Sequence, residues 1–78
     1  MIGVLHVLER AHPAARSLHA QRIEYADLPK RWERFWCTTA WGTEFSTDRV
    51  EIDPQPAGER SVFFKTRHTA YRLEKVEL

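Results

Sequence analysis

Residues 61–74, SVFFKTRHTAYRLE, constrain the fold more than any other segment, because their two halves can pair in one useful register. A turn at residues 67–68 places three pairs on one face: Thr66 with Thr69, Phe64 with Tyr71, and Val62 with Leu73. The other face then carries Lys65 with Ala70, Phe63 with Arg72, and Ser61 with Glu74. A slip of one residue would mix apolar and polar side chains on both faces, since strand side chains alternate. The sequence therefore predicts an antiparallel hairpin with one buried face, closed by a two-residue turn or by a four-residue loop in the same register.

The segment before this hairpin also has strand character. Residues 41–45, WGTEF, alternate with period two and predict a strand whose buried face includes Trp41. The following STDR then predicts a turn or bulge, and Val50 and Ile52 continue the alternation in a second strand. Residues 53–59, DPQPAGE, contain two prolines and a glycine and predict a loop. Together these segments predict an antiparallel meander.

The first part of the chain has two possible secondary structures. The opening MIGVLHVL fits a central strand that is apolar on both faces, or a first helical turn, and we favour the strand. It has no basic residues before its apolar run, so we interpret it as part of the fold and not as a signal peptide. Pro13 stands where a helix can begin, although the apolar face of HPAARSLHAQR is thin. The next segment, RIEYA, predicts a short strand with Ile23 and Tyr25 inward.

Residues 27–41, DLPKRWERFWCTTAW, concentrate aromatic and basic side chains. Such a string is typical of a surface that stacks on bases and contacts phosphates, but it also fits an amphipathic helix. Asp27 is a suitable N-cap and Pro29 is tolerated in a first turn. Two separate arcs then form on a helical wheel: the apolar Leu28, Trp32, Phe35 and Trp36, and the basic Lys30, Arg31 and Arg34. Because the two arcs are segregated, we expect the aromatic side chains to pack in the core.

These patterns predict one α+β domain spanning residues 1–78. Its antiparallel β-meander of about 4–5 strands packs against one amphipathic helix at about residues 28–37. A chain of 78 residues has room for a single domain. Cys37 is the only cysteine, so an internal disulfide and a multi-cysteine zinc site are both excluded. We expect a cytoplasmic protein that has no membrane contact.

The residues that carry catalysis in other proteins do not form a recognisable set here. Cys37 could act as a nucleophile only beside a base, and a small buried residue is its more usual role. The histidines are scattered at positions 6, 12, 19 and 68, and no pair has the spacing of helical zinc ligands. Three isolated glycines form no phosphate-binding loop. We therefore expect no enzyme activity, no cofactor and no metal.

Seven side chains are the candidates for contact with a partner. Three belong to the predicted helix and four to the C-terminal hairpin: Lys30, Arg31 and Arg34, and then Phe63, Lys65, Arg67 and Arg72. Phe63 is predicted to point away from the core with basic neighbours, and an exposed aromatic of this kind is a credible contact for protein or nucleic acid. The alternative is that the helix covers this face of the hairpin.

The formal net charge of +1 gives no overall attraction to nucleic acid or to a membrane. Small size, near-neutral charge and the absence of a catalytic set favour a non-catalytic binding protein. We expect an inhibitor or adaptor that docks on a larger protein or nucleoprotein complex. The alternative is a nucleic-acid-binding module that uses the basic residues of the helix and of the C-terminal hairpin.

The segment RVEIDPQPAGERSVFFKTRHTAYRLE is strand-rich and contains several arginines. In this composition and in its size, the chain resembles the small accessory proteins of phages and mobile elements, including anti-CRISPR proteins. The resemblance implies that the chain blocks a host nucleoprotein complex, by masking either a nucleic-acid-binding surface or a contact between subunits. It rests on no diagnostic motif and assigns no functional residues.

Overall fold

The computed structural model describes residues 1–8 and 18–77. In this part of the chain, seven strands form one antiparallel sheet and there is no helix. The strands are β1 (Ile2–Val7), β2 (Gln21–Glu24), β3 (Arg34–Thr39), β4 (Glu44–Arg49), β5 (Gln55–Pro56), β6 (Ser61–Lys65) and β7 (Ala70–Glu77). The prediction of an α+β fold with a helix at residues 28–37 is therefore wrong, and the described chain is all-β.

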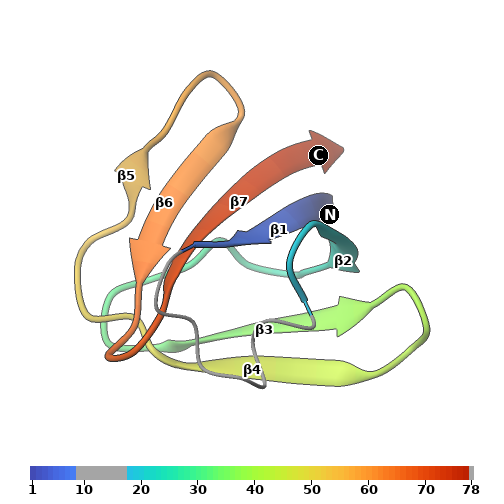
Figure 1. The fold of residues 1–78 in the computed structure, drawn as a ribbon, viewed down its shortest axis with the longest axis horizontal. Helices are drawn as coiled ribbons and strands as arrows, with labels where there is room; N and C mark the ends of the chain where they lie inside the picture. Colours follow the sequence, from blue (N-terminus) through green and yellow to red (C-terminus); the bar gives the residue numbers. More distant parts are fainter. Residues whose placement is uncertain (9–17, 78) are drawn as a thin grey trace.

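The sheet consists of two meanders that meet at its centre. The spatial order is β4-β3-β2-β1-β7-β6-β5, so consecutive strands are neighbours in the sheet except β4 and β5, which stand at its two ends. The first meander runs from β1 outward to β4, and the second runs from β7 outward to β5 (Figure 1). The first and last strands pair antiparallel over the length of β1 and join the two meanders.

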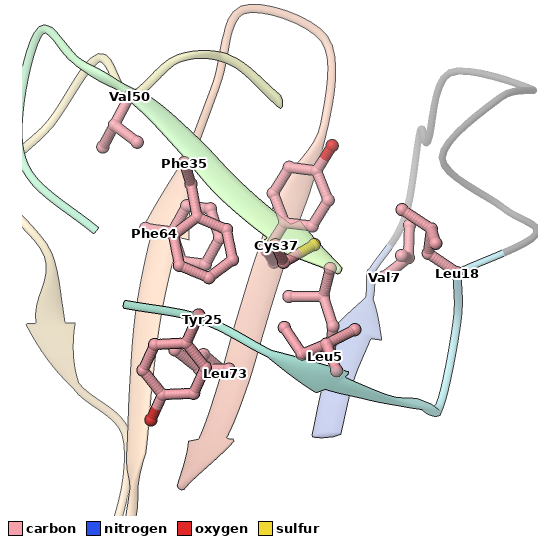
Figure 2. Close-up of a cluster of buried hydrophobic side chains, with 11 residues drawn as sticks. Leu5, Val7, Leu18, Tyr25, Phe35, Cys37, Val50, Phe64 and Leu73 are labelled. Carbon is pink, nitrogen blue, oxygen red and sulfur yellow. The ribbon is translucent and has the colours of Figure 1, made fainter. Parts of the chain in front are cut away.

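The sheet is strongly curled, so that its two outer parts face each other across the core. Figure 2 shows Phe35 of β3 against Phe64 of β6, although the two strands are far apart in the order of the sheet. The centroids of these two rings are 5.3 Å apart, and Phe64 in turn stacks on Tyr71 at 4.9 Å. After β4 the chain continues towards β6, where the backbone N–H of Glu51 donates a hydrogen bond to the carbonyl oxygen of Lys65. The buried side chains lie inside this curl.

Among the residues that the structure describes, eleven side chains form the core: Leu5, Val7, Leu18, Ile23, Tyr25, Phe35, Cys37, Val50, Phe64, Tyr71 and Leu73. Gly3 lies beside this core in β1, where the backbone of β7 approaches closely. A Cβ atom at Gly3 would stand 2.7 Å from the carbonyl oxygen of Glu74 and 3.1 Å from the ring of Tyr25. The central pairing of β1 with β7 therefore requires a residue without a side chain at this position.

The predicted C-terminal hairpin is confirmed in its register. The pairs in β6 and β7 are Ser61–Glu74, Val62–Leu73, Phe63–Arg72, Phe64–Tyr71 and Lys65–Ala70. Across the turn, the backbone N–H of Thr66 donates to the carbonyl oxygen of Thr69. Phe64, Tyr71 and Leu73 are buried, as the alternation predicts.

The N-terminal strand predictions are also confirmed. The opening segment forms β1, and Ile23 and Tyr25 at the second strand point into the core. The helix expected to begin at Pro13 falls largely on residues 9–17, which lie outside the described residues. The predicted loop at residues 53–59 contains the two-residue strand β5.

Residues 28–37 are not helical because their second half has a strand period. From Arg34 to Thr39, buried Phe35, Cys37 and Thr39 alternate with more exposed Arg34, Trp36 and Thr38. Aromatic and β-branched residues fit such a pleated, half-buried surface well. Leu28 and Trp32 precede β3, whereas Phe35 and Trp36 lie in it. The helical spacing of these four positions therefore arises by coincidence from two segments with different backbone conformations. Of the three aromatic residues assigned to the core face of the predicted helix, only Phe35 is buried, and Trp32 and Trp36 are exposed.

Two details of the β3–β4 region also differ from prediction. The chain turns at residues 39–43, where Gly42 has a φ of 86° and its N–H donates to the carbonyl oxygen of Thr39. STDR lies within β4, so the predicted turn is wrong. The predicted alternative of a bulge is confirmed, because the pairing with β3 shifts register here, between Arg34–Arg49 and Trp36–Ser46. Trp41 therefore lies in the turn, where its side chain is exposed, and its predicted burial is wrong.

Candidate functional site

The outer face of β3 carries an exposed tryptophan between polar side chains. Strand alternation sends Phe35 and Cys37 inward, so Arg34 and Trp36 point outward. Trp36 is 60% exposed, so a large aromatic surface lies in contact with water. Arg34 pairs across the sheet with Arg49 of β4, so two cations lie beside this aromatic surface.

Trp32 precedes β3 and has a strained backbone. Its φ is 70°, in the left-handed region that bulky residues rarely adopt. Two hydrogen bonds hold this conformation: Trp32 N–H donates to the carbonyl oxygen of Val50 at 2.6 Å, and Val50 N–H donates to that of Glu33 at 2.9 Å. The indole is 58% exposed, and the Arg31 guanidinium lies 4.7 Å from the ring centroid. The fold therefore presents Trp32 to solvent at the cost of local strain.

A shallow groove of about 470 Å³ lies next to Trp32. It forms where the β6–β7 turn comes beside the start of β3 and the end of β4 (Figure 1). Its walls are Trp32, Arg34, Asp48, Arg49, Glu51, Arg67 and His68. Three arginines, two carboxylates, an imidazole and an indole thus surround one space, although they come from three separate segments of the chain.

The three arginines of the groove have no carboxylate partner in the part of the chain that the structure describes. Ionic contacts within 4.0 Å occur there only between His6 and Glu74, at 3.1 Å, and between Arg31 and Asp53, at 3.9 Å. Arg34 donates one long hydrogen bond, 3.5 Å, to the carbonyl oxygen of Thr47. Like charges directly opposite in a sheet, such as Arg34 and Arg49, are destabilising by themselves. The groove therefore holds positive charge that an anion would stabilise.

The acidic side chains of the groove are equally free of cationic partners among the described residues. Asp48 lies near the phenol of Tyr71. Burial raises the pKa of Tyr71, and the negative charge of Asp48 acts in the same direction. Because neither the carboxylates nor the guanidinium groups of the groove have an ionic partner among the described residues, both kinds of group remain available to a ligand that has donors and acceptors.

A smaller hollow lies on the other side of Arg34. It has a volume of about 120 Å³ and is lined by Ala26, Asp27, Leu28, Lys30, Glu33, Arg34, Phe35 and Trp36. Arg34 lines both hollows. Through Arg34, the groove therefore adjoins a surface that carries Lys30 and the exposed Trp36 together with the carboxylates of Asp27 and Glu33. We call this surface, with the groove, the tryptophan face.

The candidate residues from the sequence divide into two groups. Lys30, Arg31, Arg34 and Arg67 belong to the tryptophan face, with Arg31 placed on the indole of Trp32. The other three lie on β6 and β7: Phe63, Lys65 and Arg72. Phe63 pairs with Arg72 and is half-buried, and no helix of the described residues covers it. Arg72 donates a hydrogen bond of 3.1 Å to Ser61 Oγ.

Sequence reasoning missed the aromatic part of this face because Trp32 and Trp36 were assigned to the core. It also missed Arg49, Asp48, Glu51 and His68, which reach the groove through the curl of the sheet. A signal for Trp36 was present in the period-two pattern of RFWCTT. The sequence contains no comparable signal for the meeting of β4 with the β6–β7 turn.

Cys37 has the properties of a core residue. It is 5% exposed, and burial raises the pKa of its thiol to about 11. Because the thiolate is the nucleophilic form, this environment suppresses its reactivity at neutral pH. No group of three or more His, Cys, Asp or Glu side chains within residues 1–8 and 18–77 is arranged to hold a metal ion. The indole, guanidinium and carboxylate groups of the tryptophan face can contact a ligand by stacking and by charge-assisted hydrogen bonds.

Comparison with protein-family models, with curated proteins and with solved structures found no match for this chain. The comparisons therefore do not support the phage or inhibitor functions implied by the resemblance in composition. The small α+β domain expected with them is replaced by an all-β domain. Within the described residues, no helix is long and apolar enough to cross a membrane.

Proposed function

We propose that this chain is a binding module for single-stranded nucleic acid, and that the tryptophan face is its binding surface. The observation that carries the proposal is the exposure of Trp32 and Trp36 beside arginines that have no carboxylate partner among the described residues. Proteins that bind single strands combine aromatic side chains, on which bases stack, with cations that contact the phosphates. The sequence alone had indicated segregated aromatic and basic arcs, and the strand conformation removes that objection.

The two kinds of group have separate tasks in this proposal. The indoles offer flat surfaces to bases, and stacking of this kind contributes about 1–3 kcal/mol per base. The guanidinium groups of Arg34, Arg49 and Arg67 offer paired N–H donors to phosphate oxygens. A phosphate between Arg34 and Arg49 would also remove the repulsion between these cross-strand partners.

A single strand fits this surface better than a duplex, because duplex bases are stacked on one another and present only their edges. A nucleic acid also fits better than an acidic protein surface, because side-chain carboxylates need no exposed indole beside the cations. The net charge of +1 implies moderate affinity that depends on local contacts. The proposal places the protein in the cytoplasm, where the unmodified thiol of Cys37 would remain reduced.

The first experiment is a fluorescence-anisotropy titration of a labelled single-stranded oligonucleotide at several salt concentrations. Three phosphate contacts predict a slope of about −2 in log K against log salt, or a loss of about 20-fold between roughly 50 and 200 mM salt. Trp36→Ala should weaken binding about 5- to 150-fold, in line with the loss of one stacking contact. Replacing both Arg34 and Arg49 with glutamine should reduce the slope by about 1.4.

Arg60→Gln is the matched control. Arg60 is exposed in the loop between β5 and β6, at the opposite end of the strand order from β4 (Figure 1). Its loss should leave affinity and salt slope unchanged within error. Absence of binding at tens of micromolar protein in low salt would refute the proposal. A protein partner lost in Trp36→Ala, with no nucleic-acid binding, would assign the tryptophan face to protein recognition instead.

A further inference from the structure

We infer that the groove beside Trp32 is a subsite for one nucleotide and that it prefers guanine. The inference rests on the proposed function, because it assumes that a nucleic-acid strand lies on the tryptophan face. It goes further by assigning a role to each kind of side chain that surrounds the groove. The decisive feature is that carboxylates and guanidinium groups, none with an ionic partner in residues 1–8 and 18–77, line the same space as an exposed indole.

Trp32 provides the stacking surface of the subsite. Arg31 covers one side of the indole at 4.7 Å, and Arg31 does not line the groove. The other side of the ring is therefore available to a base. The two backbone hydrogen bonds that link residues 32 and 33 to Val50 fix the position of this ring relative to β4. A base on Trp32 would lie within the space that Asp48 and Glu51 border.

Arg34, Arg49 and Arg67 provide the phosphate contacts of the subsite. They come from β3, from β4 and from the β6–β7 turn, so they surround the groove and do not form a single row. With Asp48 and Glu51 also present, the fixed charges of the groove leave a net charge of about one positive unit at neutral pH. One phosphodiester carries one negative charge, and its binding would neutralise the groove.

The two carboxylates select the base. An ionised carboxylate only accepts hydrogen bonds, and its two oxygens match two parallel donors. Guanine presents two adjacent donors, N1–H and the exocyclic N2 amino group, on an edge that is free in a single strand. Thymine and uracil present one N–H between two carbonyl oxygens, which a carboxylate repels. Adenine and cytosine present one amino group beside an acceptor, so they rank between guanine and the pyrimidine-diones.

The test uses short thymidine oligonucleotides that differ at one central position, occupied by guanine, hypoxanthine, adenine or thymine. Competition against a labelled strand gives their relative affinities at fixed salt. We expect guanine to bind about 5- to 150-fold more tightly than thymine, the range of one good bidentate contact. Hypoxanthine lacks the N2 amino group but keeps N1–H, and should lose a large part of this preference.

The matched protein variant carries Asp48→Asn and Glu51→Gln together, which preserves shape and removes the acceptor-only character of both side chains. It should bind the all-thymine strand at least as well as the parent does, and its ratio of guanine to thymine affinity should fall close to one. Its urea midpoint, compared with that of the parent, separates an effect on recognition from an effect on folding.

Each result bears on the inference in a distinct way. Equal affinity for all four strands, together with binding that still depends on salt and on Trp36, would refute the guanine subsite and leave the proposed function intact. Absence of binding to every strand would refute both. An undiminished preference for guanine in the folded double variant would show that Asp48 and Glu51 do not read the base. The hypoxanthine comparison needs no variant, so it remains decisive if the double variant unfolds.

Discussion

Phe35 and Trp36 are adjacent in β3, and their replacement by alanine should have opposite consequences. Phe35 is 2% exposed, and its ring centroid lies 5.9 Å from that of Tyr25 and 5.3 Å from that of Phe64. Removing a buried phenylalanine costs about 3–5 kcal/mol. A domain of this size has a total stability of roughly 4–12 kcal/mol. Phe35→Ala should therefore leave little or none of the folded state at raised temperature.

Trp36→Ala should cost much less. The side chain is 60% exposed, so at most two fifths of its surface is buried against the protein, and only the contacts of this part are lost on replacement. Two fifths of about 250 Å² is about 100 Å², which corresponds to an upper limit of about 2.5 kcal/mol at 25 cal/mol per Å². Partial burial in the unfolded chain lowers this limit, and we expect a loss of about 1 kcal/mol.

Thermal unfolding followed by circular dichroism measures both variants. At about 4–8 °C per kcal/mol for a domain of this length, Phe35→Ala should lower Tm by at least about 12 °C, and Trp36→Ala by about 4–8 °C. The urea midpoint should rank the variants in the same order. If Trp36→Ala is as destabilising as Phe35→Ala, the indole belongs to the core and the tryptophan face does not exist as described. A helix at residues 28–37 would have placed both side chains on one buried arc and predicts that result.

Three further changes test the core and the turn. Gly3→Ala should lower the free energy of unfolding by about 1–3 kcal/mol, because its Cβ would meet the carbonyl oxygen of Glu74 at 2.7 Å; an unchanged urea midpoint would show that β1 and β7 can separate freely. Burial raises the pKa of Cys37 from 9.0 to about 11, so the unfolded state ionises first and stability should fall as pH rises from about 9 to about 11. Cys37→Ala should make the urea midpoint less sensitive to pH over this range, whereas parallel curves would contradict the burial of the thiol. Thr66→Val removes the hydrogen bond of 3.3 Å from Thr66 Oγ1 to the carbonyl oxygen of Thr69 and should lower Tm by about 4–8 °C. An unchanged Tm would mean that this bond does not stabilise the turn.

The C-terminal hairpin was predictable because its information is local. Each buried residue of β6 faces a buried or partly buried residue of β7, and the two strands are joined by a short turn. The alternation of apolar and polar side chains and the position of the turn therefore each specify the same pairing register of β6 with β7. The opening strand and the inward positions of Ile23 and Tyr25 were predictable for a similar reason, since short apolar or alternating segments need no distant partner to be recognised.

The helix prediction failed at the residues of the candidate site. In RFWCTT, the outward Trp36 stands between the inward Phe35 and Cys37, so three consecutive residues are apolar. This run hides the alternation of outward and inward positions that is typical of a strand. A polar residue at 36 would have left a clear period of two. Departures from local pattern of this kind are expected where function requires an exposed aromatic. The groove was beyond prediction for another reason, because Arg49 and Arg67 meet only after the sheet curls.

The central position of β1 and β7 has a consequence for how the chain folds during synthesis. The two strands are first and last in the described sequence, yet they are neighbours in the sheet. The four-stranded meander β1–β4 is synthesised before β5–β7, so it exposes the free edge of β1 until β7 arrives to pair with it. Contacts between such distant segments give a high contact order and slow folding. Interrupting translation before Ala70 should therefore yield a chain that remains open to proteases and chaperones, whereas a chain that includes β7 can form the central pair of the sheet.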